Sequence, residues 1–361
     1  MSSFLTRTGS FLPGPPVANS EIQHYLGTLF LEQRVRDKVL SLNGIGSRHY
    51  ALSKDQKATH DVYQLGALAA QECLRDGRAR HPITYLSAGS TNAPLVGPGL
   101  ASLLHAELSR TGWLQAPLEI NSNSGICSSG AQAVVNAHRA VSSGEHRAAL
   151  CLGVEQPSAI LKSSVVRPRY DWWRMLRNIK RSQWFMTVFL RSMLSDGAGA
   201  WLLEDEPRPA GLSLEIEWTF SRSFANQTPL CMKLESRNLR LSQDVGVLSK
   251  NLLPSVRHLF QELEKTRAVD LVDYHVILPH LSSYYFERTL HEFFEEFAGG
   301  RSIPYWTNLA TAGNTGSASI FIMLDEYLKS HELKGGERLL LFIPESGQFN
   351  FVLLSLRVVS A

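Results

Sequence analysis

Short apolar runs bounded by turn residues alternate with amphipathic helical patterns along most of the chain. Consecutive apolar residues predict buried strands, and such runs lie at 148–155, 199–205, 274–280, 338–346 and 351–358. Apolar residues that recur at the spacing of one helical face predict helices at 61–77, 97–112, 252–267 and 283–299. This alternation favours an α/β architecture over an all-helical or an all-β one.

The order of these elements repeats weakly between the two halves of the chain. In the first half, a strand at 83–91 is followed by a surface helix, by Cys127 and by a helix of small residues. In the second half, a strand at 274–282 is followed by a surface helix, by Asn314 and by another helix of small residues. We therefore predict two related halves around a shared centre, joined near residues 205–211, where prolines and charges cluster.

The composition indicates a soluble globular chain, with 361 residues of which 44% are hydrophobic and 19% are charged. A formal net charge of +3 is too small to indicate nucleic acid as the main partner. The start of the chain shows neither a signal-peptide pattern nor an anchor, and no stretch has the roughly 20 apolar residues that span a bilayer. These features predict a cytoplasmic protein.

Four cysteines, at positions 73, 127, 151 and 231, show the spacing of neither a disulfide framework nor a zinc site. Cys127 stands between small residues at the predicted start of a helix. Unsatisfied backbone N–H groups and the positive end of the helix dipole favour a thiolate there. The alternative is that Cys127 packs as a small buried hydrophobic side chain, which is the commoner fate of cysteine.

Two further polar residues stand where they could act together with Cys127. His280 ends an apolar strand directly after Pro279, although a histidine at a strand end is often only a satisfied polar group. His275 on the same strand is predicted to be structural. Asn314 lies among glycines and small residues at a helix start, where capping of the helix is the alternative role.

Taken together, Cys127, His280 and Asn314 resemble the Cys–His–Asn set of the thiolase-like condensing enzymes, specifically the β-ketoacyl-acyl-carrier-protein synthase III group. The resemblance runs in order through nearly the whole chain, in the segments GSFLPGPPVANSE, GIGSRHYAL, GICSSGAQAV, LSDGAGAWLLED, LPHLS, AGNTGSAS and FIPESGQFNFVLL. It implies a thiolase fold, with two pseudo-symmetric α/β halves in a five-layered αβαβα core. Residues 1–207 would form the half with Cys127, and residues 208–361 the half with His280 and Asn314.

The resemblance also implies a mechanism in which Cys127 attacks an acyl thioester of coenzyme A or acyl carrier protein. The backbone N–H groups of Cys127 and Gly347 would hold the oxyanion. A second thioester, of malonyl or β-ketoacyl type, would then take part in a decarboxylative Claisen condensation. His280 and Asn314 would donate hydrogen bonds to its thioester oxygen, so His280 is expected to stay neutral. No metal and no other cofactor enters this scheme.

Partners and rival functions follow from the same resemblance. It implies a homodimer, with a heterodimer of related subunits as the alternative. One rival function is acyl transfer to an oxygen or nitrogen acceptor without condensation. Another is a non-catalytic partner subunit of a heteromeric synthase.

Several positions depart from the pattern of the group. Leu42 and Lys38 stand where the group usually has an arginine and a tryptophan that clamp the nucleotide of coenzyme A, which favours a carrier-protein donor. The segments PHLSS and PESGQFNF replace the usual histidine loop and the usual glycine-rich closing turn. Both changes predict an unusual second substrate.

The largest departure is a long basic and aromatic segment at residues 160–195. Its basic residues include Arg167, Arg169, Arg174, Arg177, Lys180, Arg181 and Arg191, with Asp171 as the acidic residue among them. Its large aromatic residues include Trp172, Trp173, Trp184 and Phe185. We predict a dimer interface or surface helix pair, a docking face for an acidic carrier protein, or a basic amphipathic lid that touches a membrane or covers an acyl tunnel.

Overall fold

The fold is seen in a computed structural model that describes residues 1–77, 79–168, 170–179, 182–267 and 269–360. Within these residues the main sheet has nine strands in the order β5-β4-β6-β7-β1-β8-β13-β12-β11. The first five strands are β5 (Glu119–Ser124), β4 (Tyr85–Ser90), β6 (Ala148–Glu155), β7 (Gly197–Glu204) and β1 (Phe4–Phe11). The other four are β8 (Leu212–Ser223), β13 (Asn350–Ser360), β12 (Arg338–Pro344) and β11 (Val276–Pro279).

The two groups of strands join where β1 and β8 pair. Only two residue pairs, Phe4 with Glu215 and Leu5 with Leu214, connect these strands, whereas β13 and β8 pair along their length. Residues 205–211 carry the chain from β7 in the first group to β8 in the second. We propose that the boundary between residues 207 and 208 divides the two halves within this connection.

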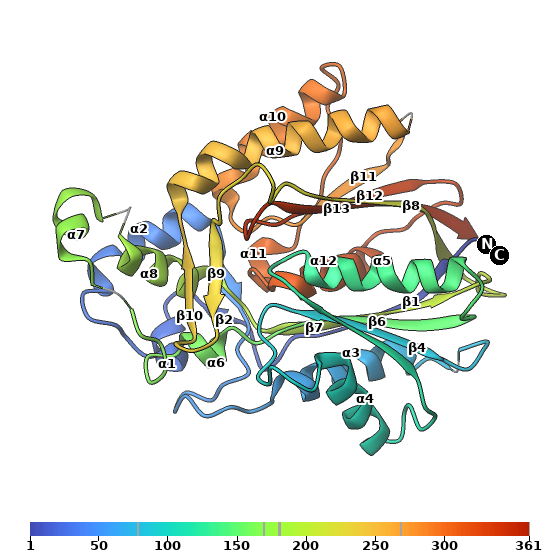
Figure 1. Ribbon diagram of the computed structural model, residues 1–361, viewed down its shortest axis with the longest axis horizontal. Coiled ribbons are helices and arrows are strands. Elements are labelled where there is room, and N and C mark those ends of the chain that lie inside the picture. Colours follow the sequence, from blue (N-terminus) through green and yellow to red (C-terminus); the bar gives the residue numbers. More distant parts are fainter. Residues whose placement is uncertain (78, 169, 180–181, 268, 361) are drawn as a thin grey trace.

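Helices complete the five layers shown in Figure 1. The outer face of the first strand group is covered by α3 (Val62–Leu74) and α4 (Leu100–Arg110). Between the two strand groups lie α5 (Ser129–Ser142) and α12 (Ser319–Ser330). The outer face of the second group is covered by α9 (Val245–Thr266) and α10 (Glu287–Phe297). The thiolase-type αβαβα architecture predicted from the sequence is therefore confirmed.

Small residues on the central helices have a packing reason. A Cβ atom added to Gly130 on α5 would lie 2.1 Å from the carbonyl oxygen of Ser317, and one added to Gly153 on β6 would lie 2.4 Å from the same atom. Ser317 belongs to the 3-10 turn η4 (Gly316–Ala318) that leads into α12. Only glycine permits the two halves to approach this closely, and this approach brings the starts of α5 and α12 together.

Replacing Gly130 by alanine is expected to destabilise the fold by about 3 kcal/mol, because overpacking a dense core typically costs ~1–3 kcal/mol and here the neighbour is backbone. Thermal or denaturant unfolding measures the loss. The matched control is Gly125→Ala, where an added Cβ would have its nearest contact at 3.4 Å from Ser129 Cβ. Equal stability of the two variants would contradict the packing argument.

All five predicted apolar strands are present, as β6, β7, β11, β12 and β13. The predicted helix at 252–267 begins earlier, because Asp244 accepts hydrogen bonds from the N–H groups of Gly246 and Val247 and caps α9. Apolar runs did not predict β8, because buried and partly exposed residues alternate along most of this strand. Apolar runs also did not predict the hairpin of β9 (Met232–Glu235) and β10 (Arg240–Gln243).

The basic aromatic segment is partly core. It forms α6 (Ser158–Leu161), α7 (Trp172–Asn178) and α8 (Gln183–Met193), and α8 packs against α2 (Gln33–Asn43). Trp184 and Phe185 on α8 are buried in a cluster with Val39 of α2. The prediction of a surface location is therefore wrong for these two aromatic residues.

Arg191 is also a core residue. Its side chain is fully buried, with Nε 3.3 Å from Glu32 Oε1. It also donates to the carbonyl oxygens of Leu161 and Gly27, at 2.7 and 2.6 Å. Arg191 is thus a structural cation and belongs to no docking face.

On α7, by contrast, Trp172 and Trp173 are 54% and 80% exposed. Arg167 and Arg177 are exposed as well. Arg169, Lys180, Arg181 and the side chain of Arg174 lie outside the described residues. None of the helices within the described ranges combines the length and apolar character needed to cross a bilayer.

Candidate active site

Two cavities meet at Cys127, where the central helices begin. Cys127 follows β5 and stands two residues before α5, and Asn314 stands just before the turn that leads into α12. Cys127 and His280 line one cavity, and Cys127 and Asn314 line the other. Ser282 borders both cavities. The fold thus brings the three predicted residues to one place from three distant parts of the chain.

Both cavities are mainly apolar. The first is bounded by side chains of α9, α10 and the histidine loop, including Leu248, Leu252, Val256, Leu281, Phe286 and Leu290. The second is bounded by side chains of α6, α8 and the β9–β10 hairpin, including Ile160, Met193, Met232, Leu234 and Leu241. Each cavity therefore offers a mainly apolar surface next to Cys127.

The thiol of Cys127 is buried, with 9% of the residue exposed. Burial raises its pKa well above the usual range, and the carboxylates of Glu345 and Glu155 raise it further. The backbone N–H of Cys127 lowers the pKa of the thiol, as expected at a helix start. Burial and two nearby carboxylates therefore outweigh the effect of the helix start, which by itself favours the thiolate.

His280 is a neutral imidazole in an apolar place. Burial lowers its pKa to about 4. Nδ1 lies 2.6 Å from Ser319 Oγ, and within the described residues Nε2 has no hydrogen-bond partner. When the Ser319 hydroxyl donates to Nδ1, the ring proton stays on Nε2, which is then free to donate to a substrate.

Asn314 both shapes its turn and offers an amide group. Its side-chain oxygen accepts a 2.9 Å hydrogen bond from the N–H of Gly316, so the capping role exists. Its Nδ2 has only a long contact, 3.5 Å, with the carbonyl oxygen of Ser282. The backbone is held on both sides, because Asn314 N donates to the Met193 carbonyl and Ser195 N donates to the Asn314 carbonyl. The amide N–H is therefore positioned and still available.

Two backbone N–H groups near the thiol are free. Within the described residues, the N–H groups of Cys127 and Gly347 donate no hydrogen bond to another residue. The carbonyl of Gly347 points the other way and accepts from the N–H groups of Cys231 and Met232 at 2.9 and 3.1 Å. Gly347 packs against Ile126, the neighbour of Cys127 in the chain, with 2.8 Å between a Cβ atom added to Gly347 and Ile126 Cγ1. Free N–H donors are what a developing oxyanion requires.

Two buried carboxylates near Cys127 were missed by sequence reasoning. Glu155 accepts from the Thr91 N–H at 2.8 Å and from the Ser317 N–H at 3.2 Å, and burial raises its pKa. Glu345 lies in the closing turn after β12. The sequence did contain one signal for Glu345. It is a charged residue that follows the apolar strand residues of FIPES, at a turn predicted to line the second-substrate side.

Other residues singled out in the sequence lie away from the three. The side chain of His275 is 43% exposed and lies 3.5 Å from Glu337, which fits its predicted structural role. Leu42 and Lys38 are exposed on α2. Neither position supplies the aromatic or guanidinium group needed to stack on or pair with a nucleotide.

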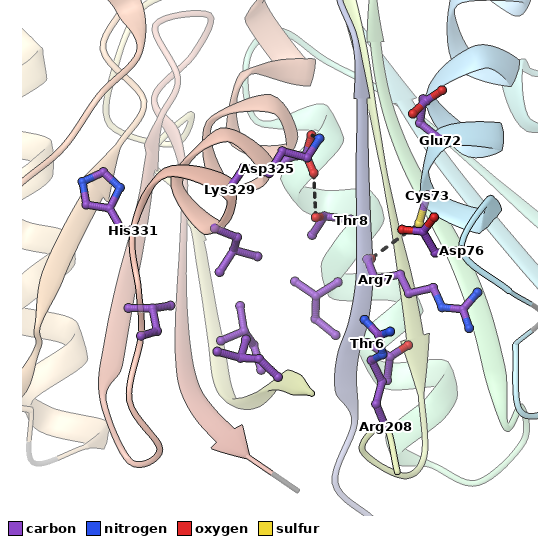
Figure 2. A pocket seen from close by; sticks show the side chains of 15 residues that line it. Thr6, Arg7, Thr8, Glu72, Cys73, Asp76, Arg208, Asp325, Lys329 and His331 are labelled. Atoms are coloured by element: carbon purple, nitrogen blue, oxygen red, sulfur yellow. Dashed lines mark hydrogen bonds and ion pairs between the residues drawn. The ribbon is translucent and has the colours of Figure 1, made fainter. Parts of the chain in front are cut away.

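A cavity of about 280 Å³ lies toward the far end of α12, away from Cys127 (Figure 2). Charges of both signs border it, including Arg7, Asp76 and Lys329. Asp325 at its edge is already bonded by the hydroxyls of Thr8 and Ser10. The cavity contains none of the predicted site residues, and we assign it no part in the chemistry.

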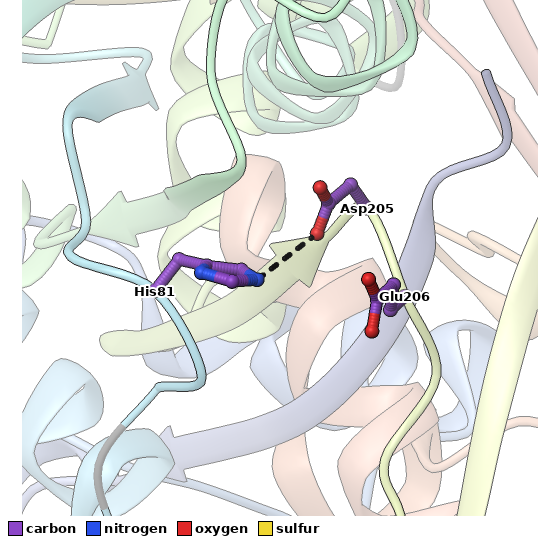
Figure 3. Close-up of side chains that lie close together, drawn as sticks. All are labelled: His81, Asp205 and Glu206. Atoms are coloured by element: carbon purple, nitrogen blue, oxygen red, sulfur yellow. Dashed lines mark ion pairs between the residues drawn. The ribbon is translucent and has the colours of Figure 1, made fainter.

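His81, Asp205 and Glu206 form a group of possible metal ligands (Figure 3). Two guanidinium groups neutralise the carboxylates. Arg147 Nε lies 2.6 Å from Asp205, and Arg80 lies 2.6 Å from Glu206. A cation would have to displace these ion pairs, and we assign no metal here.

Comparison with known proteins gives relatives over the full length of the chain. No protein-family model matches the sequence. The β-ketoacyl-[acyl-carrier-protein] synthase III of Xanthomonas oryzae pv. oryzae is 25% identical over 350 residues, covering 94% of this chain and 93% of the relative. The synthase III of Acholeplasma laidlawii is 24% identical over 328 residues, covering 90% and 89%.

Solved structures show the same extent of similarity. The tetronic acid condensing enzyme AbyA1 matches with a TM-score of 0.75 at 21% identity, covering 99% of this chain and 100% of that one. The 3-oxoacyl-[acyl-carrier-protein] synthase III of Aquifex aeolicus VF5 matches with a TM-score of 0.71 at 19% identity, with the same coverage. OleA of Xanthomonas campestris matches with a TM-score of 0.77 at 18% identity, covering 99% and 98%.

The structural matches define the class as the thiolase-like α/β fold. The sequence relatives narrow the similarity further: over nearly its whole length the chain is distantly similar to the β-ketoacyl-[acyl-carrier-protein] synthase III group of condensing enzymes.

Proposed function

We propose that the protein loads an acyl group on Cys127 and condenses it with a second thioester in a decarboxylative Claisen reaction. The observation that carries the proposal is the meeting of Cys127, His280 and Asn314 at two apolar cavities. An acyltransferase without condensation needs no amide donor beside the histidine, so the available Nδ2 of Asn314 favours condensation.

In the first half-reaction, the sulfur of Cys127 attacks the carbonyl carbon of an acyl thioester. A carbon–sulfur bond to Cys127 forms, and the bond to the departing thiol breaks. The proton of the Cys127 thiol leaves with that thiol, so no external base is consumed. The free N–H groups of Cys127 and Gly347 stabilise the oxyanion between these events.

In the second half-reaction, a malonyl-type thioester loses CO₂ and becomes an enolate. Negative charge builds up on its thioester oxygen, which accepts hydrogen bonds from two neutral donors, His280 Nε2 and Asn314 Nδ2. The enolate carbon attacks the acyl group on Cys127 and releases the sulfur as a thiolate, which takes a proton from water to restore the thiol. Neutral donors suit an apolar place, where a charged imidazolium would be costly.

The two apolar cavities bear on the substrates. Both cavities are mainly apolar and are lined by Cys127, so we propose that the acyl chain carried by Cys127 extends into one of them. The second thioester is then of malonyl type, because a β-ketoacyl thioester has no carboxylate to lose as CO₂ and would have to give up an α proton instead. The pathway would be fatty-acid-like or secondary-metabolite biosynthesis, in the cytoplasm, by a homodimer.

One experiment tests the function as a whole. The purified protein is mixed with a panel of acyl thioesters on coenzyme A and on acyl carrier protein, and its intact mass is measured. We expect an acyl adduct, and then a β-ketoacyl product together with released CO₂ once a malonyl thioester is added. Absence of any adduct over the panel would contradict the proposal. Transfer of the adduct to oxygen or nitrogen acceptors alone would support the rival acyltransferase.

The exposed surface of α7 bears on the donor. Carrier proteins are acidic, and α7 offers Arg177 next to two exposed tryptophans, with Arg167 close before it in the chain. We propose this surface as the carrier-protein docking face; contact with a membrane is the competing use of the same residues.

Charge reversal at Arg167 and Arg177 is expected to lower acyl transfer from the carrier protein about tenfold at low salt, and less at high salt, because screening weakens surface attraction. Transfer from the coenzyme A thioester should change little. Arg110→Glu, on the exposed end of α4, is the matched control. Unchanged carrier-protein rates would exclude this docking face.

A further inference from the structure

Glu345 is a buried carboxylate in the turn between β12 and β13, and 2% of the residue is exposed. Among the ion pairs of the described residues none involves it. Its partners are neutral donors: the hydroxyl of Ser128, the N–H of Gln348 at 3.4 Å and the side-chain amide of Asn350 at 3.1 Å. A carboxylate without a cation is costly to bury, so hydrogen bonds must compensate for its loss of water.

Two of these donors directly follow residues of the proposed active site in the chain. Ser128 directly follows Cys127 and is the residue at the N-cap of α5. Gln348 directly follows Gly347, whose free N–H is the second proposed oxyanion donor. One carboxylate therefore holds the residue after the nucleophile in the first half and the residue after the oxyanion donor in the second half.

The closing turn also packs directly on the nucleophile segment. A Cβ atom added to Gly347 would lie 2.5 Å from Glu345 Oε1 and 2.8 Å from Ile126 Cγ1. The peptide between Gly347 and Gln348 is fixed from both sides, because its carbonyl accepts from Cys231 and Met232 and its N–H donates to Glu345. The turn cannot move without losing these bonds.

We infer that Glu345 is a positioning residue, which aligns the Cys127 thiol and the Gly347 N–H for attack on the acyl thioester. This inference rests on the proposed function of the site. It assigns to the chain's unusual PESG turn the task of holding the oxyanion donors, in place of a glycine-rich turn.

A glutamine in place of Glu345 isolates the effect of the carboxylate's charge. The same space and much of the same hydrogen bonding would be available to a glutamine. The carboxylate also opposes ionisation of Cys127, since its charge contributes to the raised pKa of the thiol. Cys127 therefore keeps its proton until a thioester binds, and that proton then leaves with the departing thiol.

The test compares Glu345→Gln with Glu204→Gln in the full-length protein. Glu204 is an equally buried glutamate with neutral donors, the Thr6 hydroxyl and the Arg80 N–H, at the other end of the first strand group. Two quantities are measured for each: the rate of acyl-adduct formation, and the pH dependence of iodoacetamide alkylation at Cys127, followed by peptide mass spectrometry.

For Glu345→Gln we expect a maximal acylation rate about tenfold lower with little change in KM, since losing one oxyanion donor outright costs about 10²–10³ and here the donor is displaced. We also expect the alkylation profile to move to lower pH, because a negative charge near the thiol is removed. Glu204→Gln should match the unchanged protein in both. The alkylation profile shows that the charge near the thiol has been removed, and the acylation rate separates the roles, because a purely packing role would leave that rate unchanged.

Two further variants keep the test decisive if Glu345→Gln folds poorly. Glu345→Asp keeps the charge but shortens the reach, so acylation should slow without an acid shift of the alkylation profile. Ser128→Ala removes one link, and its loss in acylation should not add to that of Glu345→Gln, because both act through the same contact. Wild-type acylation in Glu345→Gln or Glu345→Asp would overturn the inference. If the unchanged protein forms no adduct at all, the proposed function fails, and that result is separable because the alkylation profiles can still be compared.

Discussion

Replacing Cys127 by alanine is expected to abolish the covalent acyl adduct and to reduce product formation by at least about 10⁴-fold, since loss of a nucleophile leaves only binding and oxyanion stabilisation. The buried sulfur lies where both apolar cavities meet. Intact-protein mass spectrometry reports the adduct directly, and product analysis reports the turnover.

The control is Cys73→Ala. Cys73 is another buried, free cysteine with a raised pKa, but it lies on α3 beside the cavity at the far end of the sheet. This variant should form the adduct as the unchanged protein does. An adduct that persists in Cys127→Ala would assign the nucleophile to another residue.

Replacing His280 or Asn314 by alanine is expected to slow decarboxylation of the second thioester by about 10²–10³-fold, the usual cost of removing one donor to a developing oxyanion. The Cys127 adduct should still form, because neither side chain is needed for the first attack. Release of CO₂ from a malonyl thioester, measured beside adduct formation, separates the two half-reactions. His275→Ala, at the opposite end of the same strand, is the control, since that side chain is partly exposed and lies beside Glu337.

The pH dependence of the same step follows from the burial of His280. Its pKa is lowered to about 4, so the neutral donor is present above that value and is lost as the pH falls through it. The contribution of His280 to decarboxylation should therefore be constant between about pH 5 and 8. A rate that falls with a midpoint near 6.5, the unperturbed pKa of histidine, would contradict the buried, neutral assignment.

Much of the fold was predictable because it depends on local chemistry. Apolar runs predicted the strands β6, β7, β11, β12 and β13, whose residues are mostly buried. Strand β8 was not predicted, because partly exposed residues alternate with buried ones and the strand has no continuous apolar run. The position of α8 was also predicted incorrectly. Its basic and aromatic residues indicated a surface helix, but Trp184 and Arg191 are fully buried.

The residues of the candidate site were predicted from the sequence, but the charge state of the Cys127 thiol was not. Cys127, His280 and Asn314 could be found from residue type and the positions of strand ends and helix starts. The charge state of the thiol could not, because it depends on Glu345 and Glu155, which are 218 and 28 positions away along the chain (345 − 127 and 155 − 127). Sequence reasoning saw the helix start, which favours thiolate, but not the burial and the carboxylates that reverse the preference.

The sequence alone determined the α/β class, the small residues of the two central helices and the three polar residues that stand beside them. These follow from local rules: hydrophobic periodicity, turn chemistry and the space that glycine leaves open. Only the tertiary structure decided that one apolar cavity lies on each side of Cys127, and that Glu345 holds Ser128 and Gln348 together. The physical reason is that cavities and buried charges are set by which distant segments pack against one another, and residue spacing along the chain does not record that packing.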